Sequence, residues 1–313
     1  MNKALYAIIS FLTLVLVTGT NTVSNAQQLP LYSEYMFNIL EINPAYAGFK
    51  NSIQFTSSFR KQFNGIKSSP QTAIASFDMP VGDTRVGVGA RIFDDRFSVT
   101  KTFGLQSAYS YNIETGENSK LYMGLQVGVL KYKASLTDLI ISDAGDPNFQ
   151  NDQTTFVANF GAGLFFSTDK FYAGLSAPNF IRTNLRQSNI AVTANEVNQN
   201  MHFFFNTGFL LYMNDDFVLK PSVLIRGVQG LPLQYDISGN VFFREMLAVG
   251  LSYRTNSAIA GLLNFKVNSQ FSLGYSYDYN ISRLRDFNKG THEILLRYQI
   301  PFWKDQPLPS FLF

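Results

Sequence analysis

Apolar and small polar residues alternate along most of this chain, and that alternation limits its possible folds more than any other feature. In residues 102–113 one set of alternate positions is mostly apolar and the other is small or polar, and residues 120–133, 270–280 and 291–300 repeat the pattern. Successive side chains of a β-strand point to opposite faces of the sheet, so an alternation of period two predicts strands. No apolar pattern of helical period runs beyond two turns after residue 26, so the sequence predicts an all-β protein.

Fourteen such segments are spaced along the chain. The expected strands are residues 52–60, 71–79, 85–94, 100–113, 120–133, 155–167, 170–178, 202–213, 217–226, 233–243, 246–254, 258–267, 270–280 and 291–300. A length of about ten residues suits a tilted strand that crosses a membrane. We therefore predict a transmembrane antiparallel β-barrel of the outer-membrane type with about 14 strands. A soluble β-sandwich is the alternative, and it would need shorter strands and longer polar turns.

The lengths of the connections give independent support to the barrel. Connections after even-numbered strands are tight and rich in turn-forming residues, such as residues 81–84 and 114–118. Connections after odd-numbered strands are mostly longer, notably residues 134–154 and 179–201. Outer-membrane barrels have short periplasmic turns and long external loops, so we expect the tight turns and both chain ends to face the periplasm.

Composition excludes several other classes of protein. Charged residues and aromatic residues each make up 15% of the chain, and there is no cysteine. Disordered chains have few aromatic residues and high charge, and the lack of cysteine excludes a disulfide scaffold and a lipid anchor on cysteine. A net charge of +3 is too small to indicate nucleic-acid binding, so we expect no nucleic-acid partner.

Residues 1–26 have the three parts of a secretory signal peptide. Lys3 supplies a positive start, residues 4–17 are mostly apolar, and Ser24-Asn25-Ala26 offers the small residues that signal peptidase reads. This apolar run is too short for a membrane-spanning helix, which needs roughly 20 residues. We expect cleavage after Ala26. The remaining chain then divides into an N-terminal segment (27–50), a barrel (51–300) and a periplasmic tail (301–313).

The two faces of each predicted strand differ in polarity. An arginine or lysine on the lipid face at the bilayer midplane costs about 2–4 kcal/mol, so the wholly apolar rows are expected to face lipid. The lumen then receives the small residues and the charges Arg85, Arg91, Lys220, Asp236, Lys266, Asp278, Glu293 and Arg297. These charges either line a pore or pair into a network that keeps the lumen closed, and we favour the network. Tyrosines near strand ends are expected at the membrane interfaces, namely Tyr109, Tyr111, Tyr172, Tyr212, Tyr279 and Tyr298.

Candidates for chemistry are few. The two histidines, His202 and His292, lack the neighbours of a nucleophilic site, so we expect neither an enzyme nor a cofactor. An external loop offers oxygen atoms for calcium from Asp143, Asp146 and Asp152. Their spacing lacks the alternating ligands and final glutamate of the known calcium loop, so a solvated turn is the preferred interpretation.

The N-terminal segment is too apolar to be a free tail. Either it folds into the lumen as a plug, or it docks at the periplasmic mouth against a partner, and residues 43–46 are expected to anchor it at the periplasmic rim. Candidate partner-contact residues are Tyr32, Tyr35, Phe37, Asn43, Pro44, Tyr46 and, in the C-terminal tail, Trp303.

Five blocks of sequence, in order, resemble the PorP/SprF family of outer-membrane proteins. The opening block reads Leu31-Tyr32-Ser33-Glu34-Tyr35-Met36-Phe37-Asn38, with Ile42-Asn43-Pro44-Ala45-Tyr46-Ala47-Gly48 after it. The others are residues 60–72, where Phe63 replaces the usual Trp, residues 85–95, residues 171–179, and residues 274–278 with 290–294. The likeness extends over nearly the whole chain after residue 26.

The resemblance implies a non-enzymatic barrel tied to type IX secretion and gliding motility in Bacteroidetes. Its implied partners are components of the type IX secretion system and a secreted surface adhesin, in addition to outer-membrane lipid. We therefore expect a scaffold for the secretion or surface attachment of adhesins. A passive porin or a transporter of hydrophobic solutes is the alternative. Whether the chain is a core component or an accessory stays open at this stage.

Overall fold

Most of the chain that the computed structural model describes, residues 32–139, 146, 149–179, 201–228 and 231–303, is β-strand. The strand segments are β1 (Ser52–Lys61), β2 (Gln71–Pro80), β3 (Val86–Phe97), β4 (Thr100–Gly116), β5 (Ser119–Ala134), β6 (Gln153–Thr168), β7 (Phe171–Asn179), β8 (His202–Phe209), β9 (Leu211–Tyr212), β10 (Phe217–Val228), β11 (Gln234–Phe243), β12 (Leu247–Arg254), β13 (Ala258–Lys266), β14 (Phe271–Asn280) and β15 (Thr291–Pro301). β8 and β9 are one strand interrupted at Leu210, because both pair with β10.

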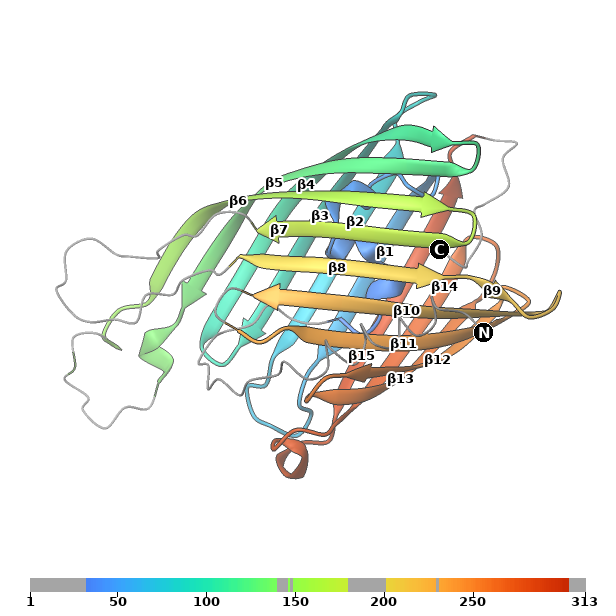
Figure 1. Ribbon diagram of the computed structural model, residues 1–313. Helices are drawn as coiled ribbons and strands as arrows, with labels where there is room; N and C mark the ends of the chain where they lie inside the picture. The colour runs from blue at the N-terminus through green and yellow to red at the C-terminus, as the bar shows by residue number, and fades with distance from the viewer. Residues whose placement is uncertain (1–31, 140–145, 147–148, 180–200, 229–230, 304–313) are drawn as a thin grey trace.

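Every strand pairs in antiparallel fashion with its neighbours in the chain, and the first and last strands close the sheet into a barrel (Figure 1). β1 pairs with β15 from Ser52 opposite Pro301 to Lys61 opposite His292. Closure leaves no unpaired sheet edge, which is the condition for a sheet to cross a membrane. The predicted all-β, fourteen-stranded antiparallel barrel is confirmed, and each predicted strand boundary lies within three residues of the observed one.

Among the described residues, no helix is both long enough and apolar enough to span a membrane.

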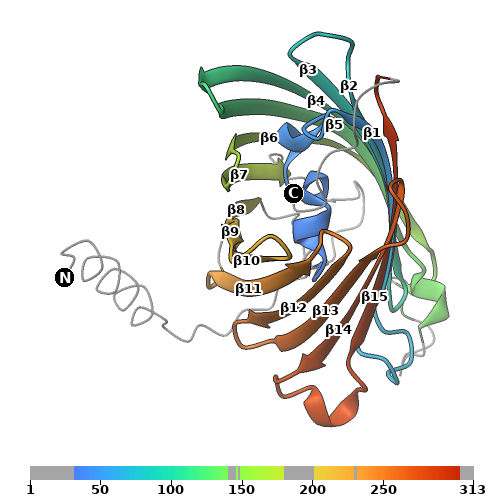
Figure 2. The ribbon, with the colours of Figure 1, turned by 90° about the vertical axis from the view of Figure 1, so that its right-hand side faces the viewer.

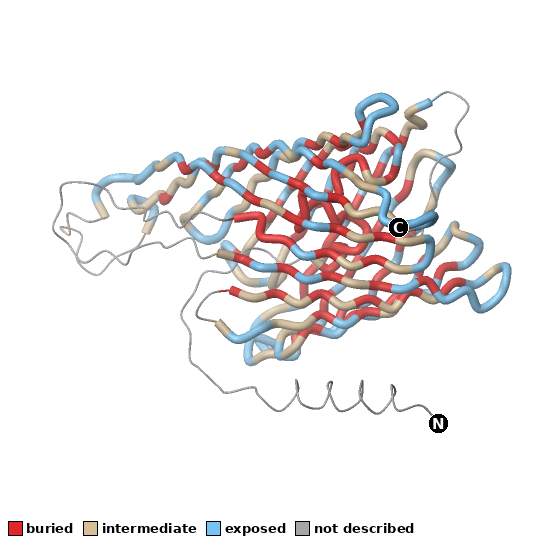
Figure 3. Tube along the Cα trace, turned by 45° about the horizontal axis from the view of Figure 1, so that its top comes forward, coloured by how far each residue is buried: buried red, intermediate tan, exposed pale blue. Residues whose placement is uncertain are grey.

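Buried and exposed residues alternate along the strands, as Figure 3 shows. On β5 the outward positions from Leu121 to Val129 are apolar, and Leu125, Val127 and Val129 are 65%, 53% and 52% exposed. The inward positions of the same strand are Tyr122, Gly124, Gln126, Gly128 and Leu130. The prediction that the apolar rows face outward is therefore correct for this strand.

The connection between β3 and β4 is shorter than the parity rule predicts. β3 continues to Phe97 and β4 begins at Thr100, so only Ser98 and Val99 join them. Ser98 takes a left-handed backbone conformation (φ 54°), which lets the chain reverse in two residues. Asp95 and Arg96, which lie outside the expected strand 85–94, are therefore strand residues.

Residues 32–50, called here the lumen segment, lie inside the barrel (Figure 2). The segment forms three 3-10 turns, η1 (Tyr35–Phe37), η2 (Ile39–Glu41) and η3 (Pro44–Tyr46), and η3 packs against β4, β5 and β6. Two further turns, η4 (Leu136–Asp138) and η6 (Arg285–Phe287), belong to connections between strands. The core of the protein is thus the contact between the lumen segment and the inner wall of the barrel.

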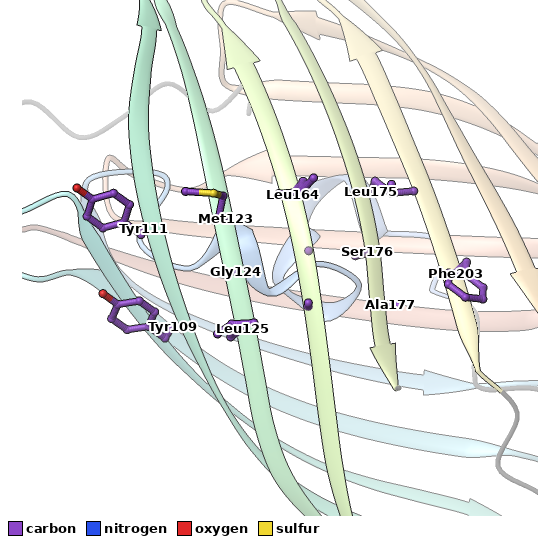
Figure 4. A pocket seen from close by; sticks show the side chains of 12 residues that line it. Tyr109, Tyr111, Met123, Gly124, Leu125, Leu164, Leu175, Ser176, Ala177 and Phe203 are labelled. Carbon is purple, nitrogen blue, oxygen red and sulfur yellow. The ribbon is translucent and has the colours of Figure 1, made fainter. Parts of the chain in front are cut away.

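A groove of about 560 Å³ lies on the outer face of β4–β8 (Figure 4). Two small outward residues, Ala162 and Ala177, are paired across β6 and β7 and form its floor, and larger apolar side chains such as Leu125 and Leu175 form its sides. Figure 4 shows the lumen segment passing behind these strands.

Candidate functional site

The lumen segment owes its course to a few residues with strong local preferences. Asn43 caps η3 by accepting a hydrogen bond from the backbone N–H of Ala45 at 3.0 Å, and Pro44 occupies the first turn position, where its missing N–H costs nothing. Gly48 has φ +67°, a conformation that glycine adopts without strain, and a Cβ there would come within 2.8 Å of Gly87. The chain can therefore turn tightly from the segment into β1.

Three inward glycines of the wall make room for the backbone of the segment at Ala45 and Ala47 and for the side chain of Asn43. A Cβ on Gly124 of β5 would lie 2.2 Å from the backbone nitrogen of Ala45, and one on Gly87 of β3 would lie 2.1 Å from the carbonyl oxygen of Ala47. A Cβ on Gly163 of β6 would lie 2.0 Å from Oδ1 of Asn43. No side chain fits at these positions while the segment is docked, so the glycines act as its receptor surface.

Hydrogen bonds fix the middle of the segment against this surface. Nδ2 of Asn43 donates to the carbonyl oxygen of Leu164 at 2.9 Å. The hydroxyls of Ser176 and Ser110 donate to the carbonyl oxygens of Ile42 and Ala47, each at 2.6 Å. Gly124 and Gly163 lie five residues inside the tight-turn ends of β5 and β6. Residues 43–46 are therefore held within the lumen and not at its rim, which differs from the expected anchor at the periplasmic rim.

An ionic cluster holds the beginning of the segment on the opposite wall. Arg60 of β1 donates to Oδ2 of Asp278 at 2.6 Å and to Oε2 of Glu293 at 2.7 Å. Arg254 of β12 lies 2.9 Å from Asp236 and 3.4 Å from Asp278. All five side chains are at most 6% exposed. Buried charges are tolerated when they are paired and hydrogen-bonded, and these five are paired across β1, β11, β12, β14 and β15.

Ser33 completes this cluster from the lumen segment. Its hydroxyl donates to Oδ1 of Asp278 at 2.7 Å, and its backbone N–H donates to Oε2 of Glu293 at 2.9 Å. The same hydroxyl oxygen accepts from Arg60 at 3.2 Å and from Arg254 at 3.3 Å. The small side chain of serine thus contacts both signs of charge, and the cluster ties the segment to the strands that close the barrel.

Two carboxyl groups of the segment are also buried, Glu34 beside β13 and Glu41 beside β3. Oε2 of Glu34 accepts from Nδ2 of Asn264 at 2.8 Å, and burial, reinforced by the charge of Glu293, raises the pKa of Glu34 to about 8. Oε2 of Glu41 pairs with Arg91 at 3.0 Å, and burial raises the pKa of Glu41 to about 7 although Arg91 lowers it. Both glutamates belong to the lumen segment and not to a membrane-crossing strand.

Arg91 begins a second polar network on β3–β7. It donates to the carbonyl oxygen of Glu41 at 2.7 Å and also to Gln106. Nε2 of Gln106 donates to Oδ1 of Asn159 at 2.9 Å, and Asn159 donates in turn to Asn179. The network spans from the lumen segment to the far end of β7, so it connects the segment with the strand that enters the long 180–201 connection.

An aromatic cluster packs between the lumen segment and the wall at β6 and β7. Phe165 is fully buried, and its ring centroid lies 5.4 Å from that of Tyr46, 5.2 Å from Phe49 and 5.7 Å from Tyr172. Lys220 lies between aromatic rings, 5.4 Å from Tyr172 and 6.0 Å from Phe37. Tyr172 was expected at a membrane interface, and that expectation is wrong, because Phe171, Ala173 and Leu175 take the outward positions of β7 and Tyr172 points inward.

The charges that the sequence places in the lumen divide by their position along the strands. Lys220, Asp236, Asp278, Glu293 and Arg297 are buried at inward positions. Arg91 is partly buried, and Lys266 is half-buried at the end of β13. Arg85 is exposed in the turn before β3, because β3 begins at Val86. The structure therefore does not bring Arg85 to the other seven.

Most candidate partner-contact residues pack against the inner wall of the barrel and are not accessible to a partner. Tyr35, Phe37, Asn43, Pro44 and Tyr46 are buried against the inner wall, and Tyr32 is half-buried. A partner would meet these side chains only if the lumen segment left its place. Trp303 follows β15, is 44% exposed and packs edge-on against Phe302 at 5.0 Å. Among the seven candidates, Trp303 is thus the most accessible in this state.

Sequence reasoning missed several residues of the docking site. Arg60 and Thr56 occupy inward positions of β1, and Asp78 and Ser76 occupy inward positions of β2. The alternation within each strand was therefore sufficient to place Arg60 and Asp78 in the lumen. Glu34 and Glu41 lie outside any strand and have no periodic signal. The predicted lumen set held five cations and three acids, and this imbalance was the available hint that acids from elsewhere enter the lumen.

The candidate calcium ligands are only partly described. Asp143 lies outside the described residues. Asp152 pairs with Lys133 at 3.1 Å and accepts from the hydroxyl of Thr137 at 2.8 Å. Within the described part of the chain, no three acidic, histidine or cysteine side chains group closely enough to hold a metal ion. Of the two histidines, His202 is buried at the start of β8, and His292 faces outward and bonds the hydroxyl of Tyr275 at 2.8 Å.

Every block that carries the family resemblance takes part in docking the lumen segment. The opening block is the segment itself. Arg60, Asp278 and Glu293 come from three other blocks or part-blocks and meet at Ser33, Gly87 contacts Ala47, and Ser176 bonds Ile42. Segments spread along 260 residues of sequence thus converge on one intramolecular interface.

Comparisons with solved structures find other barrels. Omp33 of Acinetobacter baumannii is 8% identical with a TM-score of 0.46, and the alignment covers 80% of this chain and 100% of that one. The toluene transporter TbuX of Ralstonia pickettii is 9% identical with a TM-score of 0.47, covering 85% and 92%. The KdgM porin is 10% identical with a TM-score of 0.40, covering 79% and 99%.

No curated protein matches the sequence. The model of one protein family does, over residues 24–298, which include the lumen segment and thirteen of the fourteen strands in full. The chain therefore belongs to the PorP/SprF family of type IX secretion system membrane proteins.

Proposed function

We propose that this outer-membrane barrel is a protein-binding scaffold of the type IX secretion and gliding apparatus. In this proposal the tight turns and chain ends bind periplasmic components of the machinery. The long connections, residues 134–154 and 179–201, contact an exported adhesin on the other side. Residues 1–26 serve as the signal peptide that directs the chain to export, and the barrel itself carries out no catalysis.

The occupied lumen is the observation that carries this proposal. The lumen segment forms hydrogen bonds with β1–β4, β6, β7 and β11–β15. Passive porins need a water-filled lumen, whereas here the inward glycines Gly87 and Gly124 are covered by backbone and the inward charges Arg60, Arg254, Asp278 and Glu293 are paired. Function is then expected at the two ends of the barrel, where proteins can bind, and membership of the family gives the kind of protein.

Conductance of the purified barrel in planar bilayers tests the scaffold against the porin alternative. We expect no large, stable channels from the wild-type chain. The variant Gly124→Ala, which places a Cβ against the backbone of Ala45, should raise the frequency of channel openings. Large channels from the wild-type chain would favour the passive porin or hydrophobic-solute transporter.

Crosslinking in native membranes tests the partners directly. A photo-reactive residue at Trp303 or in the turn at Asp83 should capture periplasmic machinery, and one in residues 134–154 should capture a secreted protein. A deletion strain should lose that secreted protein from the cell surface. A deletion strain with normal surface proteins and no crosslinks at either end would contradict the scaffold. The mass of the mature chain tests cleavage after Ala26.

A further inference from the structure

A row of cations crosses the outer surface of five neighbouring strands. Lys61 lies directly opposite Gln71, Gln71 opposite Arg96, Arg96 opposite Lys101, and Lys101 opposite Lys133. The row therefore runs across β1–β5 with four cations in five positions. All five side chains share the outward parity of their strands, and the adjacent outward residues are Phe59 on β1, before Lys61, and Phe103 on β4, after Lys101.

Such a row is unfavourable for the isolated protein. Like charges directly opposite each other on one face of a sheet destabilise it. Asp94 compensates in part by pairing with Arg96 at 2.5 Å and Lys101 at 2.9 Å, and Asp152 pairs with Lys133 at 3.1 Å. The three cations remain 62%, 45% and 44% exposed, so these are surface pairs that a stronger anion can replace. The row thus keeps an excess of exposed positive charge.

The row lies where the apolar outer surface ends. On β5 the outward residues are apolar from Leu121 to Val129, a length of about 27 Å at ~3.4 Å per residue, and Lys131 and Lys133 follow. This length, on a tilted strand, matches the apolar band of about 25 Å on outer-membrane barrels. Lys131 still contacts that band, because its ammonium lies 5.8 Å from the ring of Phe156.

Along the strands, the charged row does not continue onto β12 and β14, although Arg283, Arg285 and Lys289 are exposed in the connection between β14 and β15. On β12 and β14, at the same end of the strands, the outward residues are Tyr253 and Tyr279, which are 45% and 51% exposed. This end carries the long connections and therefore faces the outer leaflet in barrels of this type. A ligand that covers the row must be anionic and must also tolerate the apolar surface directly beside it.

We propose that Arg96, Lys101 and Lys133, with Lys61 and Lys131 at the two sides, form a binding site for the phosphate groups of an outer-leaflet lipid. The phosphates bind the exposed cations and displace Asp94 and Asp152 from them in part. The acyl chains lie along the apolar outer surface of β4–β6, past Phe103 and Phe156. The site fixes lipid on the β1–β5 side of the barrel and leaves the tyrosine-lined side free.

Native mass spectrometry of the full chain in detergent tests the site, with lipid A bearing two phosphates as the probe and dephosphorylated lipid A as its comparison. A basic residue near an anionic surface contributes about a factor of five in affinity. The double variant Lys101→Gln/Lys133→Gln should therefore bind lipid A about 30-fold more weakly. The double variant Lys120→Gln/Lys170→Gln, whose changes lie at the tight-turn end, should bind like the wild type.

Three outcomes would overturn the proposal. They are equal binding of lipid A by the wild type and Lys101→Gln/Lys133→Gln, equal binding of lipid A and its dephosphorylated form, and displacement of the lipid by millimolar inorganic phosphate, which would indicate a site for a soluble anion. Thermal unfolding without lipid checks that the double variant folds. Should it not fold, the single variant Lys133→Gln, with about a five-fold expected loss, replaces it.

Discussion

The hydroxyl of Ser33 donates to Oδ1 of Asp278 at 2.7 Å, although 245 residues separate the two in the chain. Arg60 binds the same carboxylate from the first strand at 2.6 Å, and Glu293 of the last strand binds Arg60 at 2.7 Å. The complete cluster exists only after the first and last strands have met. The lumen segment therefore reaches its final position together with barrel closure or after it.

Removing Arg60 should destabilise both the barrel closure and the docked segment. The variant Arg60→Ala leaves Glu293 without the arginine that it pairs with and leaves Asp278 with Arg254, at 3.4 Å, as its one remaining ion-pair partner among the described residues. Breaking a buried ion pair by removing one partner costs about 3–5 kcal/mol. The loss is measured as a lower midpoint of urea unfolding in detergent. The readout of unfolding is the change in gel mobility that a folded barrel shows on heating.

An exposed arginine provides the control for this variant. Arg96→Ala removes an ion pair whose arginine is 62% exposed, and such pairs contribute about 1 kcal/mol or less. Adding Glu293→Gln to Arg60→Ala should recover part of the stability, because it removes the uncompensated carboxylate. Equal losses for Arg60→Ala and Arg96→Ala would show that the cluster does not hold the barrel closed.

The strands could be predicted from the sequence because lipid and lumen impose opposite polarities on successive residues. The stretch from Leu121 to Val129 is an example. Its outward positions must be apolar because they face lipid, whereas its inward positions can be polar or small. The prediction failed where the lumen was not polar. Tyr172 points inward, where its ring stacks on Phe165 of β6, which in turn contacts Tyr46 and Phe49 of the lumen segment. Runs such as Phe203-Phe204-Phe205, apolar on both faces, carry the signal for an apolar lumen.

The docking site could be predicted only in part, because it depends on contacts between distant segments. The inward positions of Asp278, Glu293 and Lys220 follow from alternation alone. The partners of these residues cannot be predicted in this way. Ser33 and Glu34 lie in a segment without a periodic pattern, and its local sequence does not indicate which strands it contacts. The glycines belong to the small residues that were expected to face the lumen, but only the structure identifies the backbone of Ala45 and Ala47 as what packs against Gly124 and Gly87.

Filling a receptor glycine should displace the lumen segment without changing any charge. In Gly124→Ala the new Cβ would lie 2.2 Å from the backbone nitrogen of Ala45, so the segment or the strand must move. Overpacking of this kind costs about 1–3 kcal/mol. The chain has no cysteine, so a single Ala47→Cys reports on docking through its rate of maleimide labelling. We expect labelling about tenfold faster in Gly124→Ala, because Ala47 is fully buried when docked.

Gly261→Ala is the matched control, because a Cβ at that strand glycine meets nothing within 4 Å. Its labelling rate at Ala47→Cys should equal that of the wild-type background. Unchanged labelling in Gly124→Ala would mean that the wall yields and the segment stays, and the receptor role of the glycine would then be wrong.

Docking of the segment should weaken as the pH rises. Burial raises the pKa of Glu34 to about 8, with the charges of Glu293 and Asp278 acting in the same direction and that of Arg297 against it. The docked state therefore binds more protons than the undocked state between the ordinary glutamate pKa and about 8, and stability falls with rising pH across this window. Glu41, with a pKa of about 7, adds to the effect. Labelling of Ala47→Cys, corrected for thiol ionisation with a free thiol, should be faster at pH 9 than at pH 6.

Glu34→Gln separates this group from the others that titrate. The variant keeps an acceptor for Asn264 and cannot ionise, so the pH dependence should shrink to the part that Glu41 contributes. Glu117→Gln, in the exposed turn between β4 and β5, should leave the dependence unchanged. A Glu34→Gln profile that coincides with the wild type would assign the effect to other groups.

Phe165 should contribute more to stability than any outward phenylalanine of its strand. It is fully buried and contacts the rings of Tyr46, Phe49 and Tyr172, so Phe165→Ala opens a cavity between the wall and the lumen segment. Large cavities of this kind cost about 3–5 kcal/mol. Phe160→Ala on the same strand removes a ring that is 43% exposed to lipid or detergent and should cost much less. The unfolding midpoint of Phe165→Ala should be clearly lower than that of Phe160→Ala. Phe165→Ala should also speed maleimide labelling at Ala47→Cys, and Phe160→Ala should not. Similar midpoints with unchanged labelling would mean that the aromatic cluster does not hold the segment in place.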